Sequence, residues 1–178
     1  FIGICITGST FVSSASAADQ QLAEQYAPIL YFVDGERCYP VNVSYALENS
    51  YLYEYGNPVP VSNLPTAAEI SAYTADTHYL DNQRGTVAVG DNGIEQDYQS
   101  KMAALGYTIY AHVDTANNII QYWFFYAFNS GDLNRHESDW EMVQVVLSGG
   151  QPSEVMFSQH YAGQKAQWSQ VDKEGEHV

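Results

Sequence analysis

The chain has 178 residues, of which 46% are hydrophobic and 14% aromatic, a composition typical of one globular domain rather than a disordered chain. The formal net charge is −15, with only six lysines and arginines. Nucleic acids and anionic lipids bind basic faces, so we expect neither as an electrostatic partner. The acidity favours solubility first and cation binding second.

The N-terminal seventeen residues, FIGICITGSTFVSSASA, carry no charge and end in small residues. An apolar run closed by an A-x-A pattern is typical of a secretory signal peptide, so we predict cleavage after Ala17 and a secreted domain over residues 18–178. A buried first strand or helix is the alternative interpretation. The chain starts without an initiator Met and ends in GEHV, where extended character begins, so we expect it to be cut short at both ends.

The first half of the secreted domain is predicted to mix short strands, helices and loops. Strand-like runs occupy residues 26–32, 38–43 and 86–90. Helical patterns mark residues 44–56, which end at a glycine, a short helix opened by the capping box Thr66–Glu69, and residues 97–106.

Period-two patterning dominates the second half of the chain. YTIYAHVD (107–114) and IIQYWFFYAF (119–128) flank a turn and predict a hairpin, and further strands are predicted at MVQVVL (142–147) and EVMFSQHY (154–161). Such hairpins predict a mainly β fold, a single β-sandwich with short flanking helices. The bulky aromatics over 123–126 are assigned to its core rather than to a sugar-binding platform.

The stretch NRHESDWEMVQ (134–144) places a histidine and three acids beside an apolar strand. Asp139 and Glu141 share the face of the apolar residues that follow, because alternate residues of a strand point the same way. Carboxylates in such a place need a partner. Arg135 is one candidate, through a salt bridge. A hard cation with oxygen ligands, which also gives His136 a role, is the other.

Several motifs, in order along the chain, resemble known families. RHESDWE resembles the GHRHDWE heptapeptide of the necrosis- and ethylene-inducing-peptide-like secreted cytolysins, and more closely the HEGDWE stretch of the vacuolar protein sorting-associated protein 62 family and its bacterial relatives. YAPILYF, YPVNV and IQYWFFYAFN resemble segments of the latter family, and FSQHYAG resembles a histidine segment of both. These patches cover most of residues 25–178.

The resemblance implies a divalent-cation site. His136, Asp139 and Glu141 match the metal-ligating residues of the cytolysins. Asn129 stands where the cytolysins have a fourth ligand, an Asp, and Asp132 in the same loop is an alternative ligand. The oxygen-rich set favours Mg²⁺ or Ca²⁺, while the histidine keeps Mn²⁺ and Zn²⁺ open.

Two further residues match the family pattern, and two depart from it. Trp140 matches both families, and His160 matches the later histidine, which the pattern places toward the metal cleft; both are therefore assigned to ligand binding. A lone strand histidine that is satisfied within the core is the alternative for His160. Ser138 and Glu137 stand where the cytolysins have His and Arg, which counts against a cytolysin identity.

Three functions follow as hypotheses. The resemblance implies a binding module whose metal cleft grips a glycan or glycolipid head group at a membrane surface, with membrane damage as a consequence. A metal-dependent hydrolase is the alternative, with a metal-held water and Asp139, Glu141 or His160 as general base. In the third hypothesis, the metal ion only stabilises the conformation of the loop that carries its ligands. Whether the protein is an enzyme stays open.

Overall fold

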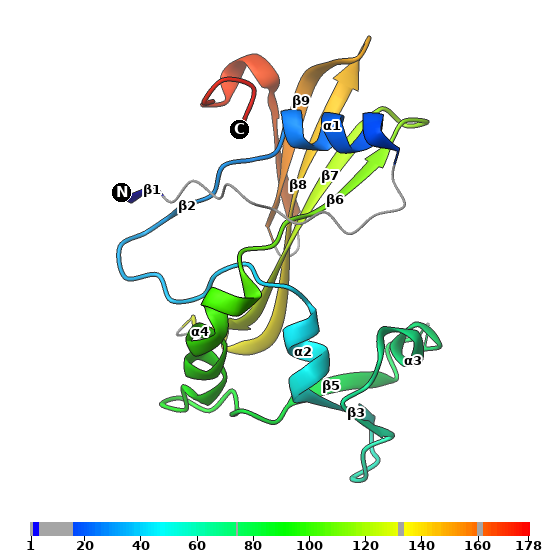
Figure 1. Cartoon of the computed structure of the whole chain (residues 1–178), viewed down its shortest axis with the longest axis vertical. Helices are drawn as coiled ribbons and strands as arrows, with labels where there is room; N and C mark the ends of the chain where they lie inside the picture. Colours follow the sequence, from blue (N-terminus) through cyan, green and yellow to red (C-terminus); the bar gives the residue numbers. More distant parts are fainter. Residues whose placement is uncertain (1, 4–15, 74, 132–133, 160–161) are drawn as a thin grey trace. The chain divides into compact units, whose positions relative to one another are not determined.

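The computed structural model describes residues 2–3, 16–73, 75–131, 134–159 and 162–178, and the chain divides into two compact units (Figure 1). Unit 1 comprises Phe1–Glu36, Tyr107–Phe124 and Trp140–Val178, and unit 2 comprises Arg37–Gly106 and Phe125–Asp139. The expected mainly β class is confirmed, because antiparallel sheets of five and three strands dominate and the helices are few and short. Face-to-face packing of two sheets into a sandwich stays a prediction.

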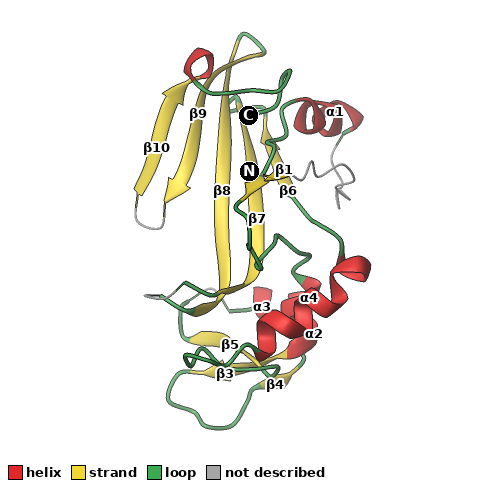
Figure 2. Cartoon of the chain, turned by 90° about the vertical axis from the view of Figure 1, so that its left-hand side faces the viewer, coloured by secondary structure: helices red, strands yellow, loops and turns green. Residues whose placement is uncertain are grey.

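The five-stranded sheet is a meander in which each strand lies beside its neighbour in sequence (Figure 2). Its strands are β6 (Tyr110–Asp114), β7 (Ile119–Asn129), β8 (His136–Ser148), β9 (Gln151–Gln159) and β10 (Ala162–Gln167). The predicted hairpin is confirmed, since β6 pairs antiparallel with β7 and Tyr110 lies opposite Trp123. The strand expected from Met142 is also confirmed, but it begins six residues earlier.

Unit 1 buries one face of this sheet. Ile120, Tyr122 and Phe124 alternate along β7 and are almost fully buried, as a strand with one covered face requires. Helix α1 (Ala17–Gln25) packs beside β6, and the Tyr122 hydroxyl donates a buried hydrogen bond to the Ala23 carbonyl at 2.9 Å. The smaller elements of unit 1 are β1 (Ile2–Gly3), which pairs with β2 (Tyr31–Phe32), and the 3₁₀ turn η1 (Trp168–Gln170).

Unit 2 contains a small sheet, on which α2 (Ser44–Asn49) packs, and two further short helices. Its strands are β3 (Ser50–Glu54), β4 (Ser62–Asn63) and β5 (His78–Asn82), and its other helices are α3 (Ala67–Ser71) and α4 (Gly93–Leu105). The Tyr45 and Tyr98 rings join α2 to α4, with centroids 5.8 Å apart. The capping box predicted at Thr66–Glu69 is present, and α4 ends at Gly106, which has φ +67°. Across the described residues, no helix is long and apolar enough to cross a membrane.

Two predicted elements of the first half are confirmed over only part of their length. The pattern over 44–56 predicted one helix, but α2 stops at Asn49 and β3 follows. The tyrosines after Asn49 recur at every second position and favour a strand, and Leu52 is buried opposite Leu80 of β5. Of the strand predicted over 26–32, only Tyr31–Phe32 is extended, because Tyr26 ends α1 with its side chain buried.

The small strand predicted over 86–90 is absent from the described structure, where these residues form turns and bends. The Thr86 backbone N–H and hydroxyl both donate to Asp91 Oδ2 at 2.9 Å, and these two bonds close a loop. Val89 is 90% exposed at the surface of this loop. Local side-chain bonding therefore overrides the strand preference of the two valines.

The bond from Tyr122 to α1 gives a stability prediction. Tyr122→Phe leaves the Ala23 carbonyl buried without its donor, so we expect it to lower the free energy of unfolding by about 1–3 kcal/mol. Urea denaturation followed by circular dichroism measures this. Tyr79→Phe, at a ring that is 37% exposed, is the control and should change stability by less than about 0.5 kcal/mol. Equal stability of Tyr122→Phe and the parent would contradict the docking of α1 on β7.

Candidate functional site

The acid-rich motif lies within strand β8 rather than before it. In a regular strand, residues three apart point to opposite faces, so His136 and Asp139 should not meet. Ser138 lies between them with φ +57°, in the left-handed region that residues other than glycine rarely adopt. This irregularity changes the alternation of side chains in unit 2. The His136 Nε2 and Asp139 Oδ1 atoms consequently lie 3.6 Å apart.

His136 is held in one tautomer. Its Nδ1 lies 2.9 Å from the Asn134 carbonyl oxygen. A carbonyl only accepts, so Nδ1 carries the proton and Nε2 is the ring atom that faces Asp139. A ring N–H fixed on a backbone carbonyl is the arrangement that orients metal-ligating histidines. The side chains of His136 and Asp139 are 29% and 15% exposed, so the pair is largely shielded from water.

Asn129, at the end of β7, completes the local cluster in unit 2. Its Nδ2 donates to Asp139 Oδ2 at 3.1 Å, and its Oδ1 accepts the Gly131 N–H at 2.9 Å. The second bond orients the amide, so the amino group and not the carbonyl faces the carboxylate. Direct ligation of a cation by Asn129, as the sequence suggested, therefore requires this amide to turn.

The competing salt-bridge partner points elsewhere. Arg135 Nη2 donates to the Asp91 carbonyl at 2.7 Å, and the guanidinium carbon lies 5.0 Å from the centre of the Phe128 ring. Glu137 accepts the Asn82 N–H at 2.7 Å, and burial raises the pKa of this carboxyl above its ordinary value, against the lowering effect of that bond. Arg135 and Glu137 therefore contact other groups, and the Asp139 carboxylate lies beside His136 and Asn129.

The remaining predicted residues belong to unit 1 or lie outside the described residues. Glu141 and Trp140 belong to unit 1, where Glu141 accepts a hydrogen bond from the Ser158 hydroxyl. Asp132 and His160 lie outside the described residues. In the part of the chain that the structure describes, no three His, Cys, Asp or Glu side chains form a group that could hold a metal ion.

An aromatic corner in unit 1 was missed by the sequence analysis, which assigned Trp123 to the core. Trp140, which is 46% exposed, lies near Trp123 and Tyr110, with ring centroids 6.4 and 5.8 Å away. We call these three residues the aromatic corner; they line a hollow of about 500 Å³. The available signal was strand parity, because Tyr122 faces α1 and its neighbour Trp123 must then face away.

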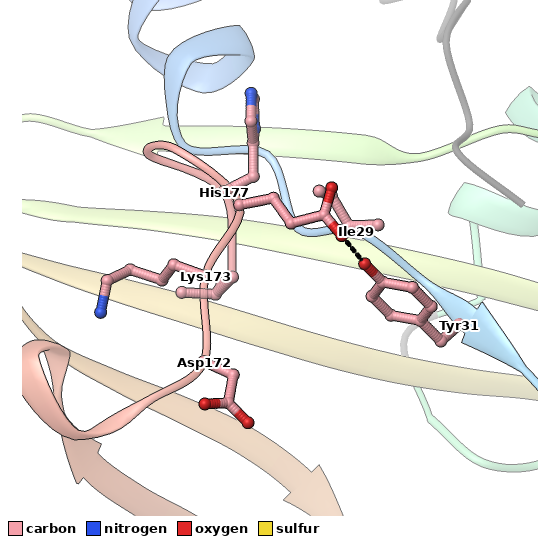
Figure 3. Close-up of a pocket in the computed structure, with 7 residues that line it drawn as sticks. Ile29, Tyr31, Asp172, Lys173 and His177 are labelled. Atoms are coloured by element: carbon pink, nitrogen blue, oxygen red, sulfur yellow. Dashed lines mark hydrogen bonds between the residues drawn. The ribbon is translucent and has the colours of Figure 1, made fainter. Parts of the chain in front are cut away.

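A second pocket, of about 340 Å³, lies at the C-terminal segment of unit 1 (Figure 3). The Tyr31 hydroxyl donates to the Glu174 carboxylate across it. Lys173 donates to the backbone carbonyls of Trp168 and Val171 within the C-terminal segment. The His177 Nδ1 lies 2.8 Å from the Ala27 carbonyl. The bonds of Tyr31 and His177 attach the C-terminal segment to the chain after α1, so we assign the pocket a structural role.

Comparison with known proteins leaves the family open. No family model matches the sequence, and no curated protein or solved structure matches it either.

The raised pKa of Glu137 gives a pH prediction. Its folded-state pKa lies above its unfolded-state value of about 4.3, so folding favours the protonated carboxyl. This contribution to stability is present below the unfolded-state pKa and is lost as the pH rises through the folded-state pKa. Glu137→Gln keeps an acceptor for the Asn82 N–H and removes the charge.

We therefore expect Glu137→Gln to have a higher melting temperature than the parent at pH 7, and a smaller difference at about pH 3, below the unfolded-state pKa. Thermal unfolding across this pH range measures both. Asp76→Asn, which removes an exposed carboxylate of unit 2, is the control and should follow the parent. A Glu137→Gln protein less stable than the parent at pH 7 would show that the charge is stabilising there.

Proposed function

We propose that the protein is a secreted binding protein that holds one divalent cation at Asp139 and offers it to a hydroxyl-rich ligand, such as a glycan or glycolipid head group. The structural observation that carries the proposal is the 3.6 Å approach of His136 Nε2 and Asp139 Oδ1. Two ligands about 2.0–2.4 Å from one ion, at a right or tetrahedral angle, lie roughly 3–4 Å apart.

The electrostatics of the pair favour a cation. With the proton on Nδ1, the Nε2 atom presents a lone pair toward the carboxylate. A largely shielded carboxylate in a chain of net charge −15 gains from any compensating positive charge. A divalent cation bound between the two side chains would supply that charge.

A sparse protein ligand set suits a small hard cation. Mg²⁺ keeps several waters and is bound by one or two carboxylates, so Asp139 with His136 is a sufficient protein contribution. Asn129, after rotation of its amide, or Asp132 would add a further oxygen, and the histidine also suits Mn²⁺ or Zn²⁺. The waters that remain are exchangeable for ligand hydroxyls, which is why a sugar-bearing head group is the proposed ligand class.

The motif resemblance supports the same proposal. RHESDWE resembles heptapeptides of secreted cytolysins in which the matching His and Asp ligate a metal ion. The resemblance also supports a membrane surface as the place where the protein meets a head group. The uncharged N-terminal run that ends in Ala15, Ser16 and Ala17 supports secretion.

Calorimetric titration with Mg²⁺, Ca²⁺, Mn²⁺ and Zn²⁺ tests the cation site. We expect one ion to bind per chain and Asp139→Asn to weaken binding at least about tenfold, because it removes the one full negative charge of the cluster. Asp76→Asn, at an exposed carboxylate of the same unit, is the matched control and should bind like the parent.

Unfolding measured without metal shows whether Asp139→Asn removes only a metal ligand or also disrupts the fold. In the presence of a chelator, Asp139→Asn should unfold close to the parent, because the charge that it removes is then uncompensated. Added cation should raise the melting temperature of the parent and not of the variant. An Asp139→Asn protein that binds every tested cation as tightly as the parent would refute the site.

A further inference from the structure

The aromatic corner faces away from the core of unit 1. Tyr122 donates to α1, so Trp123, its neighbour in β7, points to the opposite face of the sheet. Tyr110 lies directly opposite Trp123 in the β6–β7 pairing and therefore shares that face. Gln121 and Gln144, joined side chain to side chain at 2.9 Å, continue the same polar face.

The three rings are set at angles to one another. The planes of Trp123 and Trp140 meet at 80°, and those of Tyr110 and Trp140 meet at 57°. Rings inclined in this way do not form one flat platform, and they line a shallow, open hollow. The hollow they line, about 500 Å³, is within the range of small-ligand sites.

We propose that the aromatic corner binds a trimethylammonium group, as carried by choline. Aromatic ring faces carry negative partial charge and attract cations within about 6 Å of the centroid, and quaternary ammonium ions are bound in proteins by such groups of rings. Trp gives the strongest of these interactions, and two of the three rings are Trp123 and Trp140.

The chemistry of the lining selects among cations. The lining consists of three aromatic residues and contains no carboxylate, whereas hard metal ions require oxygen ligands. A protonated primary amine would need partners for three N–H groups, while a trimethylammonium group has none to satisfy. A quaternary ammonium ion is weakly hydrated, so it loses less hydration free energy than the other cations when it enters the aromatic corner.

The net negative charge of unit 1 also favours a cationic ligand. Its segments contain ten acidic side chains against two lysines, Lys165 and Lys173. This excess attracts cations and repels anions over distances up to about a Debye length. A neutral sugar gains nothing from it and would prefer a flat stacking surface, so the trimethylammonium ligand is favoured at this site.

Titration with choline, followed by the indole N–H resonances in NMR spectra, tests the proposal. We expect the signals of Trp123 and Trp140 to shift together with a dissociation constant on the order of 1 mM or below, and that of Trp168 to stay in place. The neutral isostere 3,3-dimethylbutan-1-ol, in which carbon replaces nitrogen, should bind at least about tenfold more weakly. Equal binding of the two compounds, or no binding of choline, would overturn the proposal.

Substitutions locate the binding and control for folding. Trp140→Ala should weaken choline binding at least about tenfold, whereas Trp140→Phe keeps a ring and should retain most of it. Tyr55→Ala removes an aromatic ring of unit 2 that is 65% exposed and should have no effect. Choline binding that survives Trp140→Ala in a folded protein would place the ligand elsewhere and overturn the assignment.

The aromatic corner is independent of the cation site, so choline should bind equally in the presence of a chelator, and loss of binding there would contradict the proposal. Vesicles of phosphatidylcholine should bind in preference to phosphatidylglycerol vesicles if the choline belongs to a lipid. Binding of free choline without vesicle binding identifies a soluble trimethylammonium compound as the ligand. Methyl glucoside binding at the corner in place of choline would refute the proposal.

Discussion

The candidate site depends on how the negative charge of one largely shielded carboxylate, that of Asp139, is compensated in an acidic protein. Asp139 is 15% exposed, and the chain around it carries fifteen more negative than positive charges. Shielding a carboxylate costs free energy unless hydrogen bonds or a positive charge compensate it. The Asn129 amide supplies one bond, and His136 faces the other oxygen, so the remaining requirement is positive charge.

The backbone of β8 makes this cluster possible. Ser138 adopts φ +57°, a conformation that costs a residue with a Cβ roughly 1 kcal/mol or more. The cost is offset only if the side chains that it brings together gain from the arrangement. Such irregularities within strands are common beside functional sites, where they redirect one side chain. Ser138 therefore belongs to the account of the site although its own side chain is exposed.

The elements that the sequence predicted well are those in which local pattern and tertiary burial agree. The burial of side chains alternates along β7 from Ile119 to Phe124, and α3 has a capping box that bonds within four residues. The failures arise where a distant contact decides. Leu52 is extended because it pairs with Leu80, and β10, a weakly apolar segment, exists through its pairing with β9.

Some features of the candidate site were likewise predictable from the sequence, and others were not. Residue types and spacing were sufficient to single out His136 and Asp139, because carboxylates beside an apolar strand demand a partner. They could not show that Arg135 turns to Asp91 or that the Gly131 N–H orients the Asn129 amide, since both depend on backbone groups. The aromatic corner was overlooked because three rings distant in sequence meet only through the register of the sheet.

The central claim is that Asp139 and His136 ligate one divalent cation, and a crystal soaked in Mn²⁺ tests it most directly through anomalous scattering. The account predicts a single strong peak bonded to an Asp139 carboxylate oxygen and to His136 Nε2, at distances of about 2.0–2.4 Å. An anomalous map with no peak at Asp139, while His136 and Asn129 keep their contacts to its carboxylate, would contradict it.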